Sequence, residues 1–268
     1  MNSPKYLNWI AEESGTTFED NILLTSYKLD YCLDEDVFCD WALHIRKHYI
    51  SDDELIESLR VTGLSAEDYL RQYIVPQKKD VLGPTSRSND ITEILISDLL
   101  EFVYGYKVPR CKQRNRSGKT QSEHGTDVIA YKFHKNINEP NKDDELVAAE
   151  VKAKLTASDA SPIIDAATDS KKDDHRFAHT LDYYRKKLKY IGKNSESAEV
   201  ARFLQKTENN YKTTFIGAAI SSQETVPGNV IIGIKGEQLC LRSDQKIFYI
   251  HGKTLMKLTH DIYERCIK

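Results

Sequence analysis

Residues 125–154 read GTDVIAYKFHKNINEPNKDDELVAAEVKAK, and this stretch decides the fold of the chain. Both ends are rich in β-branched and other apolar residues, whereas the middle, residues 134–145, is rich in Asn, Asp and Pro. Strands favour the first composition and turns favour the second. The stretch therefore predicts a β-hairpin whose two strands are joined by a polar loop.

Charged residues recur with the period of a strand in the second half of this hairpin. Side chains alternate between the two faces of a strand, so Glu150, Lys152 and Lys154 share one face. The small apolar residues between them share the other face, which suits packing on a core. Asp127 begins the first strand, and the hairpin can bring it next to Glu150. Two carboxylates and an ammonium group are then expected in one place.

Two crowded carboxylates repel each other, and a divalent cation relieves that repulsion. Mg²⁺ prefers oxygen ligands and binds through one or two carboxylates together with substrate phosphates. It polarises a phosphoryl oxygen and makes a bound water more acidic, and Lys152 would orient that water or neutralise charge on the phosphate. The same residues also fit an exposed strand whose outer face is merely charged. The residues by themselves leave both interpretations open.

The order of these residues resembles the PD-(D/E)xK nuclease superfamily. Glu93 stands on a predicted helix, Asp127 opens a strand and Glu150-Val151-Lys152 follows, with Thr126 in place of the signature proline. The longer runs EHGTDVIAYKF and ELVAAEVKA, with DSKKDDHR downstream, are similar to the nuclease subunit of Hachiman-type anti-phage defence systems (HamA). The C-terminal domain of anti-bacteriophage protein A shares this pattern. The resemblance covers roughly residues 86–190.

The resemblance implies an α/β fold of the restriction-endonuclease type, a mixed sheet flanked by helices. It implies a Mg²⁺-dependent (or Mn²⁺-dependent) deoxyribonuclease, an endonuclease effector of phage defence controlled by a superfamily 2 helicase partner (HamB-like). Asp127 and Glu150 would hold the metal with the backbone carbonyl of Val151, Lys152 would assist the attacking water, and Glu93 would add a third acid. Because the sequence contains no base-reading motif, we expect cutting with little sequence specificity. The alternative is a non-catalytic DNA-binding or adaptor subunit of the same helicase complex.

Glu93 lies in a predicted helix over residues 90–103, after a linker with two prolines and a glycine. Three interpretations of this residue are open. It is the third acid of the site, the partner of Asp90 in a capping box, or part of a solvated polar stripe with Asp90 and Ser97. Composition favours the last two, and the resemblance favours the first.

Basic residues flank the hairpin on both sides. Residues 107–119 carry six basic residues and no acid, and we predict that Arg114, Arg116 and Lys119 contact DNA phosphates. Downstream, an amphipathic helix with a basic outer face is predicted around residues 177–191. Lys172 and Arg176, near its start, are further candidates for phosphate contacts. The competing interpretation of both segments is an ordinary solvated surface.

The charge of the chain is unevenly distributed. The net charge is −3, but residues 1–75 hold 6 basic and 15 acidic residues, whereas the remainder holds 32 and 26. We therefore expect nucleic acid to meet the C-terminal part. We predict a smaller, acidic, mostly helical region over residues 1–80, suited to docking a partner, and a nuclease domain over residues 81–268. Within the first region, a strand near residues 21–31 is followed by helices that open at Asp34, Ser51 and Ser65.

The remaining segments complete an α/β pattern. Residues 211–222, 228–234 and 245–252 predict strands, and residues 195–209 and 253–267 predict helices. The sequence has no run of apolar residues that could span a bilayer, no signal peptide and no cysteine spacing typical of zinc sites. We therefore expect a cytoplasmic protein that does not bind membranes. A glycine-rich phosphate loop is also absent, so any use of ATP belongs to a partner.

Overall fold

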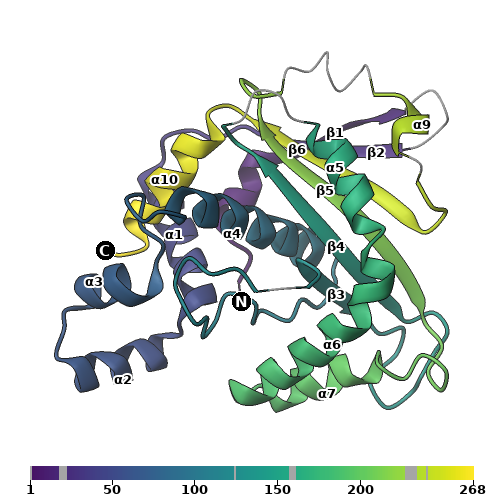
Figure 1. The fold of residues 1–268 in the computed structure, drawn as a ribbon, viewed down its shortest axis with the longest axis horizontal. Coiled ribbons are helices and arrows are strands. Elements are labelled where there is room, and N and C mark those ends of the chain that lie inside the picture. Colours follow the sequence, from purple (N-terminus) through teal and green to yellow (C-terminus); the bar gives the residue numbers. More distant parts are fainter. Residues whose placement is uncertain (1, 18–22, 124, 157–160, 227–233, 240) are drawn as a thin grey trace.

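The computed structural model describes residues 2–17, 23–123, 125–156, 161–226, 234–239 and 241–268. These residues form a six-stranded sheet in the order β1-β2-β6-β5-β4-β3 (Figure 1). Strands β2, β6, β5 and β4 run parallel to one another, and the outer strands β1 and β3 run antiparallel to their neighbours. The predicted mixed α/β sheet is confirmed. The strands span Ile10–Thr17 (β1), Leu23–Leu29 (β2), Val128–Lys132 (β3), Glu145–Lys154 (β4), Lys212–Ser222 (β5) and Gln245–Gly252 (β6).

Strands β3 and β4 form the predicted hairpin. Val128 pairs with Ala149 in antiparallel register, so Asp127 reaches the sheet directly across from Glu150. Beyond this point β4 continues past the start of β3 and pairs with β5 on its other side. The backbone of β4 next to Glu150 is therefore open on the side where Asp127 lies.

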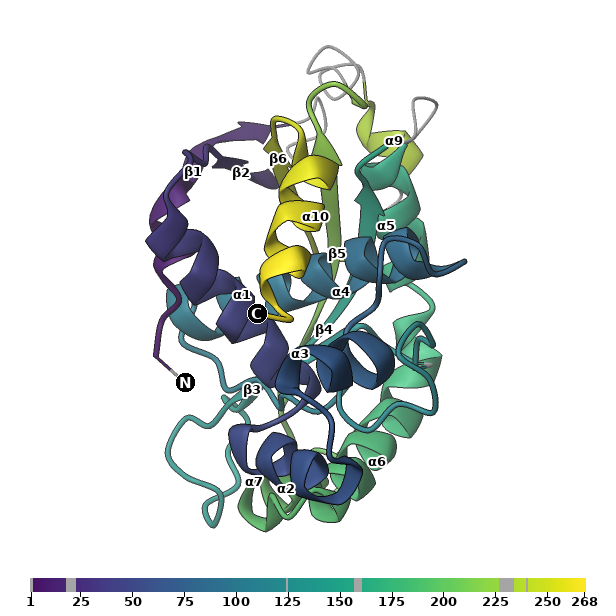
Figure 2. The same ribbon diagram turned by 90° about the vertical axis from the view of Figure 1, so that its left-hand side faces the viewer.

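Helices cover both faces of the sheet (Figure 2), as a parallel sheet requires. On one face, α1, α4 and α10 share a core with Val147 and Ala149 of β4. On the other face, Leu146 and Ala148 pack beneath α6 and α7, and α5 lies against β4 and β5. The helices span Glu35–Tyr49 (α1), Asp52–Thr62 (α2), Ala66–Tyr69 (α3), Gly83–Asp98 (α4), Pro162–Ser170 (α5), Asp173–Tyr190 (α6), Asn194–Arg202 (α7), Gly236–Leu239 (α9) and Leu255–Arg265 (α10).

Strand β5 lies in the middle of the sheet, as its apolar sequence predicts. A Cβ atom on Gly217 would come within 2.8 Å of the backbone of Ala166 in α5. Glycine at this position therefore allows α5 to pack directly on the strand. The strand predicted over residues 245–252 is β6, whereas the one predicted over residues 228–234 falls almost entirely outside the described residues.

The predicted helices are present, with corrected bounds. The predicted stripe of α6 is confirmed, because Leu181, Tyr184 and Leu188 are buried. The helix predicted over residues 195–209 ends early, at Arg202. The helix predicted from residue 90 begins instead at Gly83 and is followed by a π-helical segment over Leu99–Val103. A proline in its first turn, where no backbone N–H is needed, explains the earlier start.

Residues 1–80 are joined to the rest of the chain by strands as well as helices. The capping box of Ser51 and Glu54 at the start of α2 is present as predicted. A π-helical segment over Leu70–Ile74 extends α3. Strand β1 was not predicted, because its sequence IAEESGTT is largely polar; with β2 it extends the common sheet. Trp41 and Tyr6 belong to the same apolar cluster as residues of α4 and α10, and the division near residue 80 stays a prediction.

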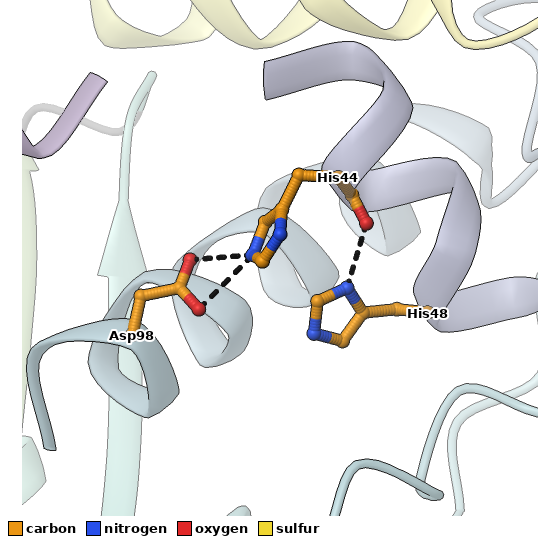
Figure 3. A group of neighbouring side chains, drawn as sticks. All are labelled: His44, His48 and Asp98. Atoms are coloured by element: carbon orange, nitrogen blue, oxygen red, sulfur yellow. Dashed lines mark hydrogen bonds and ion pairs between the residues drawn. The ribbon is translucent and has the colours of Figure 1, made fainter. Parts of the chain in front are cut away.

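Asp98 lies at the centre of a buried polar network that ties the N-terminal residues to α4 (Figure 3). Its carboxylate accepts hydrogen bonds from the Tyr6 hydroxyl at 2.5 Å and from Nε2 of His44 at 2.9 Å. The guanidinium of Arg110 lies 2.6 Å from the same carboxylate. Nδ1 of His48 donates to the His44 carbonyl at 2.9 Å, and burial together with Arg110 lowers the pKa of His48.

The ligand atoms of His44, His48 and Asp98 all lie within 4.8 Å of one another, and no other such group of three is present among the described residues. Arg110 already neutralises Asp98 and donates to Nε2 of His48 at 2.8 Å. A metal ion would have to displace this guanidinium. We therefore interpret the group as a structural tie between α1, α4 and the segment that carries Arg110.

Asp98→Ala deprives both Arg110 and His44 of their buried carboxylate. Removing one partner of a buried ion pair costs about 3–5 kcal/mol, so we expect the unfolding free energy in urea to fall by that amount. The exposed pair of Asp30 and Lys28, 2.9 Å apart, provides a control, because exposed pairs contribute little. Equal losses for Asp98→Ala and Asp30→Ala would contradict the structural role of the network.

Candidate active site

Asp127 is positioned by a turn that packs against α6. Gly125 adopts a φ of 111°, and a Cβ atom there would come within 2.7 Å of Oγ1 of Thr180. The backbone N–H of Thr126 donates to the same hydroxyl at 3.1 Å. The carboxylate of Asp127 then reaches across to β4, where Oδ2 accepts a hydrogen bond from the backbone N–H of Val151 at 2.9 Å. The turn and the strand together hold this carboxylate at the end of the hairpin.

Glu150 is buried next to Asp127, as the hairpin predicts. The residue is 6% exposed, and Oε1 accepts a hydrogen bond from Lys152 at 3.0 Å. Oε2 has no hydrogen-bond partner among the described residues. Burial and the charge of Asp127 raise the pKa of Glu150, against the opposing effect of Lys152. A buried carboxylate oxygen without a donor is the position at which a cation is most strongly favoured.

Val151 can offer its backbone carbonyl at the same place. Its N–H points toward Asp127, and the N–H and C=O of one residue face the same neighbour in a strand. The carbonyl therefore faces the edge of β4 that lies beyond the start of β3.

Lys152 is held between two carboxylates. Its ammonium lies 3.0 Å from Glu150 and 2.6 Å from Asp169, in the last turn of α5. Burial lowers the pKa of Lys152, but Asp169 and Glu150 raise it by more, so the side chain remains a cation. Asp169 also pairs with Lys172. We did not predict a role for Asp169, although it begins the quoted run DSKKDDHR.

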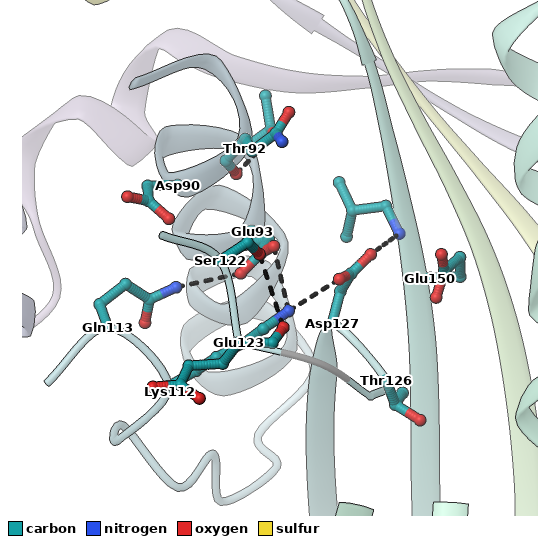
Figure 4. A network of polar contacts seen from close by, with 12 residues as sticks. Asp90, Thr92, Glu93, Lys112, Gln113, Ser122, Glu123, Thr126, Asp127 and Glu150 are labelled. Atoms are coloured by element: carbon teal, nitrogen blue, oxygen red, sulfur yellow. Dashed lines mark hydrogen bonds and ion pairs between the residues drawn. The ribbon is translucent and has the colours of Figure 1, made fainter. Parts of the chain in front are cut away.

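Glu93 projects from α4 into the interior and not into solvent. It is 5% exposed, and Asp90 lies in the middle of the helix, so the capping and polar-stripe interpretations are wrong. Its oxygens accept hydrogen bonds at 3.1 Å from Lys112 and Gln113 (Figure 4). Burial raises the pKa of Glu93 to about 8, with Lys112 opposing this shift and Asp127 adding to it.

Lys112 lies between Glu93 and Asp127, a position that the sequence did not predict. Its ammonium is 3.1 Å from Oε1 of Glu93 and 2.7 Å from Oδ1 of Asp127. In Figure 4 the side chains of Glu93, Lys112, Asp127 and Glu150 follow one another across the gap between α4 and β4. Burial lowers the pKa of Lys112, but the two carboxylates raise it by more. Glu93 is thus linked to the other acids through an ammonium group.

The residues predicted to contact DNA upstream of the hairpin are engaged in internal ion pairs. Arg116 is buried and pairs with Asp90 at 2.6 Å, so it supports the fold and is not presented to a ligand. Arg114 lies 2.9 Å from Glu54 of α2, and Lys119 lies 2.8 Å from Asp80. Acids that are distant in sequence thus neutralise this basic run.

Lys172 and Arg176, in contrast, are exposed beside the site. Lys172 shares Asp169 with Lys152. The outer face of α6 continues this basic surface with Lys186 and Lys189, which are also exposed. This side of the site therefore presents several exposed cations, of which Lys172 pairs with Asp169 and Lys186 pairs with Asp182.

The donors at the end of the hairpin suit a hard divalent cation. Asp127, Glu150 and the Val151 carbonyl offer oxygen atoms only, which favours Mg²⁺ or Mn²⁺ over zinc. The oxygen of Glu150 without a partner supports this fit. Glu93 does not join this ligand set, because Lys112 lies between it and Asp127.

Mg²⁺ should raise the melting temperature of the wild-type protein. Free metal at about 100 times the dissociation constant adds about 2.7 kcal/mol of stability, and Glu150→Gln or Asp127→Asn should abolish this gain. Asp143→Asn, in the hairpin loop, is the control that should keep it. Because the pKa of Glu150 is raised, metal must displace its proton at a higher pH than from an ordinary glutamate. The affinity for Mg²⁺ should accordingly fall as the pH is lowered through the raised pKa of Glu150. If Mg²⁺ still raised the melting temperature of Glu150→Gln, Glu150 would not be a ligand of the metal.

Comparison with known proteins identifies one family. A family profile described as HamA matches residues 4–266, nearly the whole chain. A search of curated proteins finds no match. Within the described residues, no helix is both long enough and apolar enough to cross a membrane.

Proposed function

This chain belongs to the HamA family, which acts in anti-phage defence systems of the Hachiman type, and we propose that it is their metal-dependent DNA endonuclease. The observation that carries the proposal is the meeting of Asp127, Glu150 and Lys152 at the open edge of β4, with one buried oxygen of Glu150 left without a partner. A site that served only to stabilise the fold would gain nothing from such an oxygen.

In the proposed mechanism, Asp127, Glu150 and the Val151 carbonyl would hold Mg²⁺ at the end of the hairpin. When bound, Mg²⁺ supplies positive charge to the scissile phosphate and lowers the pKa of a coordinated water. Lys152 orients the attacking water and stabilises charge that develops on the phosphate. Asp169 fixes the position of the Lys152 ammonium.

We propose that DNA reaches this site along the start of α6. Lys172 and Arg176 are exposed there and would contact backbone phosphates, which carry no sequence information. Cleavage with little sequence specificity follows from such contacts.

We propose that a partner helicase controls the nuclease. A nuclease without sequence specificity endangers its host, so its activity must be inhibited until the complex encounters foreign or damaged DNA. Part of a restraint is built into the ion pairs of Arg114 with Glu54 and of Lys119 with Asp80, which withhold two cations from DNA. Purification of a fully active enzyme that needs no partner would contradict this control.

Plasmid cleavage with Mg²⁺, by the protein alone and together with the helicase of its own system and ATP, tests the nuclease. We expect Glu150→Gln and Lys152→Ala to lose at least about 100-fold in rate, as expected when a group that stabilises the transition state is removed. A chelator should abolish cleavage by the wild type. Lys154→Ala changes the next lysine on the same face of β4 and should retain activity within a few-fold.

The adaptor function would replace this proposal under a different set of results. It predicts tight DNA binding without cleavage under any of these conditions. It also predicts that Glu150→Gln and Lys152→Ala protect cells against phage as well as the wild type does.

Lys172→Ala and Arg176→Ala should weaken DNA binding in a salt-dependent manner. Each lost phosphate contact reduces the slope of log affinity against log salt by about 0.9 for duplex DNA, measured in chelator to prevent cleavage. Lys212 lies at the start of β5, at the end of the strand that is distant from Glu150 and Lys152. Lys212→Ala is therefore the matched control and should leave the slope unchanged. If Lys212→Ala reduced the slope of log affinity against log salt as well, the DNA would not follow the start of α6.

Arg116→Ala should lower the stability of the protein instead of its DNA affinity, because it leaves Asp90 buried without its partner.

A further inference from the structure

We infer that Lys112 is a built-in cation of the active site, which takes the position of a second metal ion, so that the protein binds one divalent ion and not two. The inference rests on the proposed function and adds the metal stoichiometry of the site. It is carried by the position of one ammonium group between two acids.

The ammonium of Lys112 is placed where a bridging cation would lie. It is 3.1 Å from Glu93 and 2.7 Å from Asp127, and the side chain is 4% exposed. Glu93 comes from α4, whereas Asp127 immediately precedes β3, so the two acids come from different parts of the fold. A buried carboxylate and a partly buried one that converge from separate elements form a site for positive charge, and in this chain a side chain supplies it.

The other contacts of these acids show which side of the site remains for a metal. The second oxygen of Glu93 accepts a hydrogen bond from Gln113, so both of its oxygens have donors. Asp127 faces Lys112 with one oxygen and β4 with the other. Oε2 of Glu150, in contrast, has no donor among the described residues. The oxygen that remains for a metal is therefore Oε2 of Glu150, the neighbour of Asp127.

A divalent ion between Glu93 and Asp127 would have to expel the ammonium. Lys112 would then be left buried without a counter-charge, which is strongly unfavourable. The Lys187 ammonium donates to the backbone carbonyl of Lys112 at 3.3 Å, which further fixes this residue in place. The arrangement thus excludes a second ion while Asp127 stays available to the first.

Isothermal titration calorimetry with Mn²⁺ on the full chain tests the inference without relying on activity. We expect one bound ion in the wild type and two in Lys112→Met and Lys112→Gln, because the vacated position is lined by two carboxylates. The double variant Lys112→Met/Glu93→Gln should return to one ion. Lys107→Met, an exposed lysine of the same segment that pairs with Glu199, is the control and should bind one.

Two bound ions in the wild type would overturn the inference and leave the nuclease proposal intact. One ion in well-folded Lys112→Met and Lys112→Gln would show that Lys112 is only a structural tie, and would overturn it as well. A wild type that binds no Mn²⁺ would overturn both the inference and the proposed metal dependence. The wild-type stoichiometry decides between one ion and two even if the variants fail to fold.

Discussion

The pairing of β3 with β4 is the constraint on which the site depends. Antiparallel register between Val128 and Ala149 brings Asp127 directly across from Glu150, although like charges repel. A slip of one residue would turn Glu150 to the opposite face of the sheet. The apolar residues of the hairpin are buried on both faces, so the core fixes this register. The stability of the sheet thus holds together two carboxylates that would otherwise separate.

The layers of the fold explain why Glu93 contacts Asp127 only through the ammonium group of Lys112. Glu150 shares its face with Ala148, beneath α6, whereas α4 and its Glu93 pack on the face of Ala149. A side chain from α4 can approach Asp127 only around the edge of β4. Lys112 spans that distance, because its long side chain lets the ammonium reach both carboxylates. Glu93 is therefore coupled to the site through charge, although it does not share the ligand positions of Glu150.

The sequence predicted those features that have a local period. The hairpin, the placement of Asp127, Glu150 and Lys152, and the stripe of α6 all follow from alternation or helical spacing. The ion pairs of the site have no such signature. Lys112 with Glu93 and Lys152 with Asp169 join residues of different elements, and nothing in the local pattern of either partner indicates the other. Strand β1 was missed for a related reason, since pairing with β2 and not its own composition makes it a strand.

The same limit applies to charge. An acidic N-terminal part and a basic remainder predict where nucleic acid binds only if each charge faces solvent. Arg114, Arg116 and Lys119 instead face Glu54, Asp90 and Asp80, so part of the asymmetry is neutralised inside the molecule. The exposed cations that remain near the site include Lys172 and Arg176, where α5 gives way to α6. Two of the acids that neutralise the basic run, Glu54 and Asp80, belong to residues 1–80, so any partner that moves this region also changes how much positive charge the rest of the chain presents.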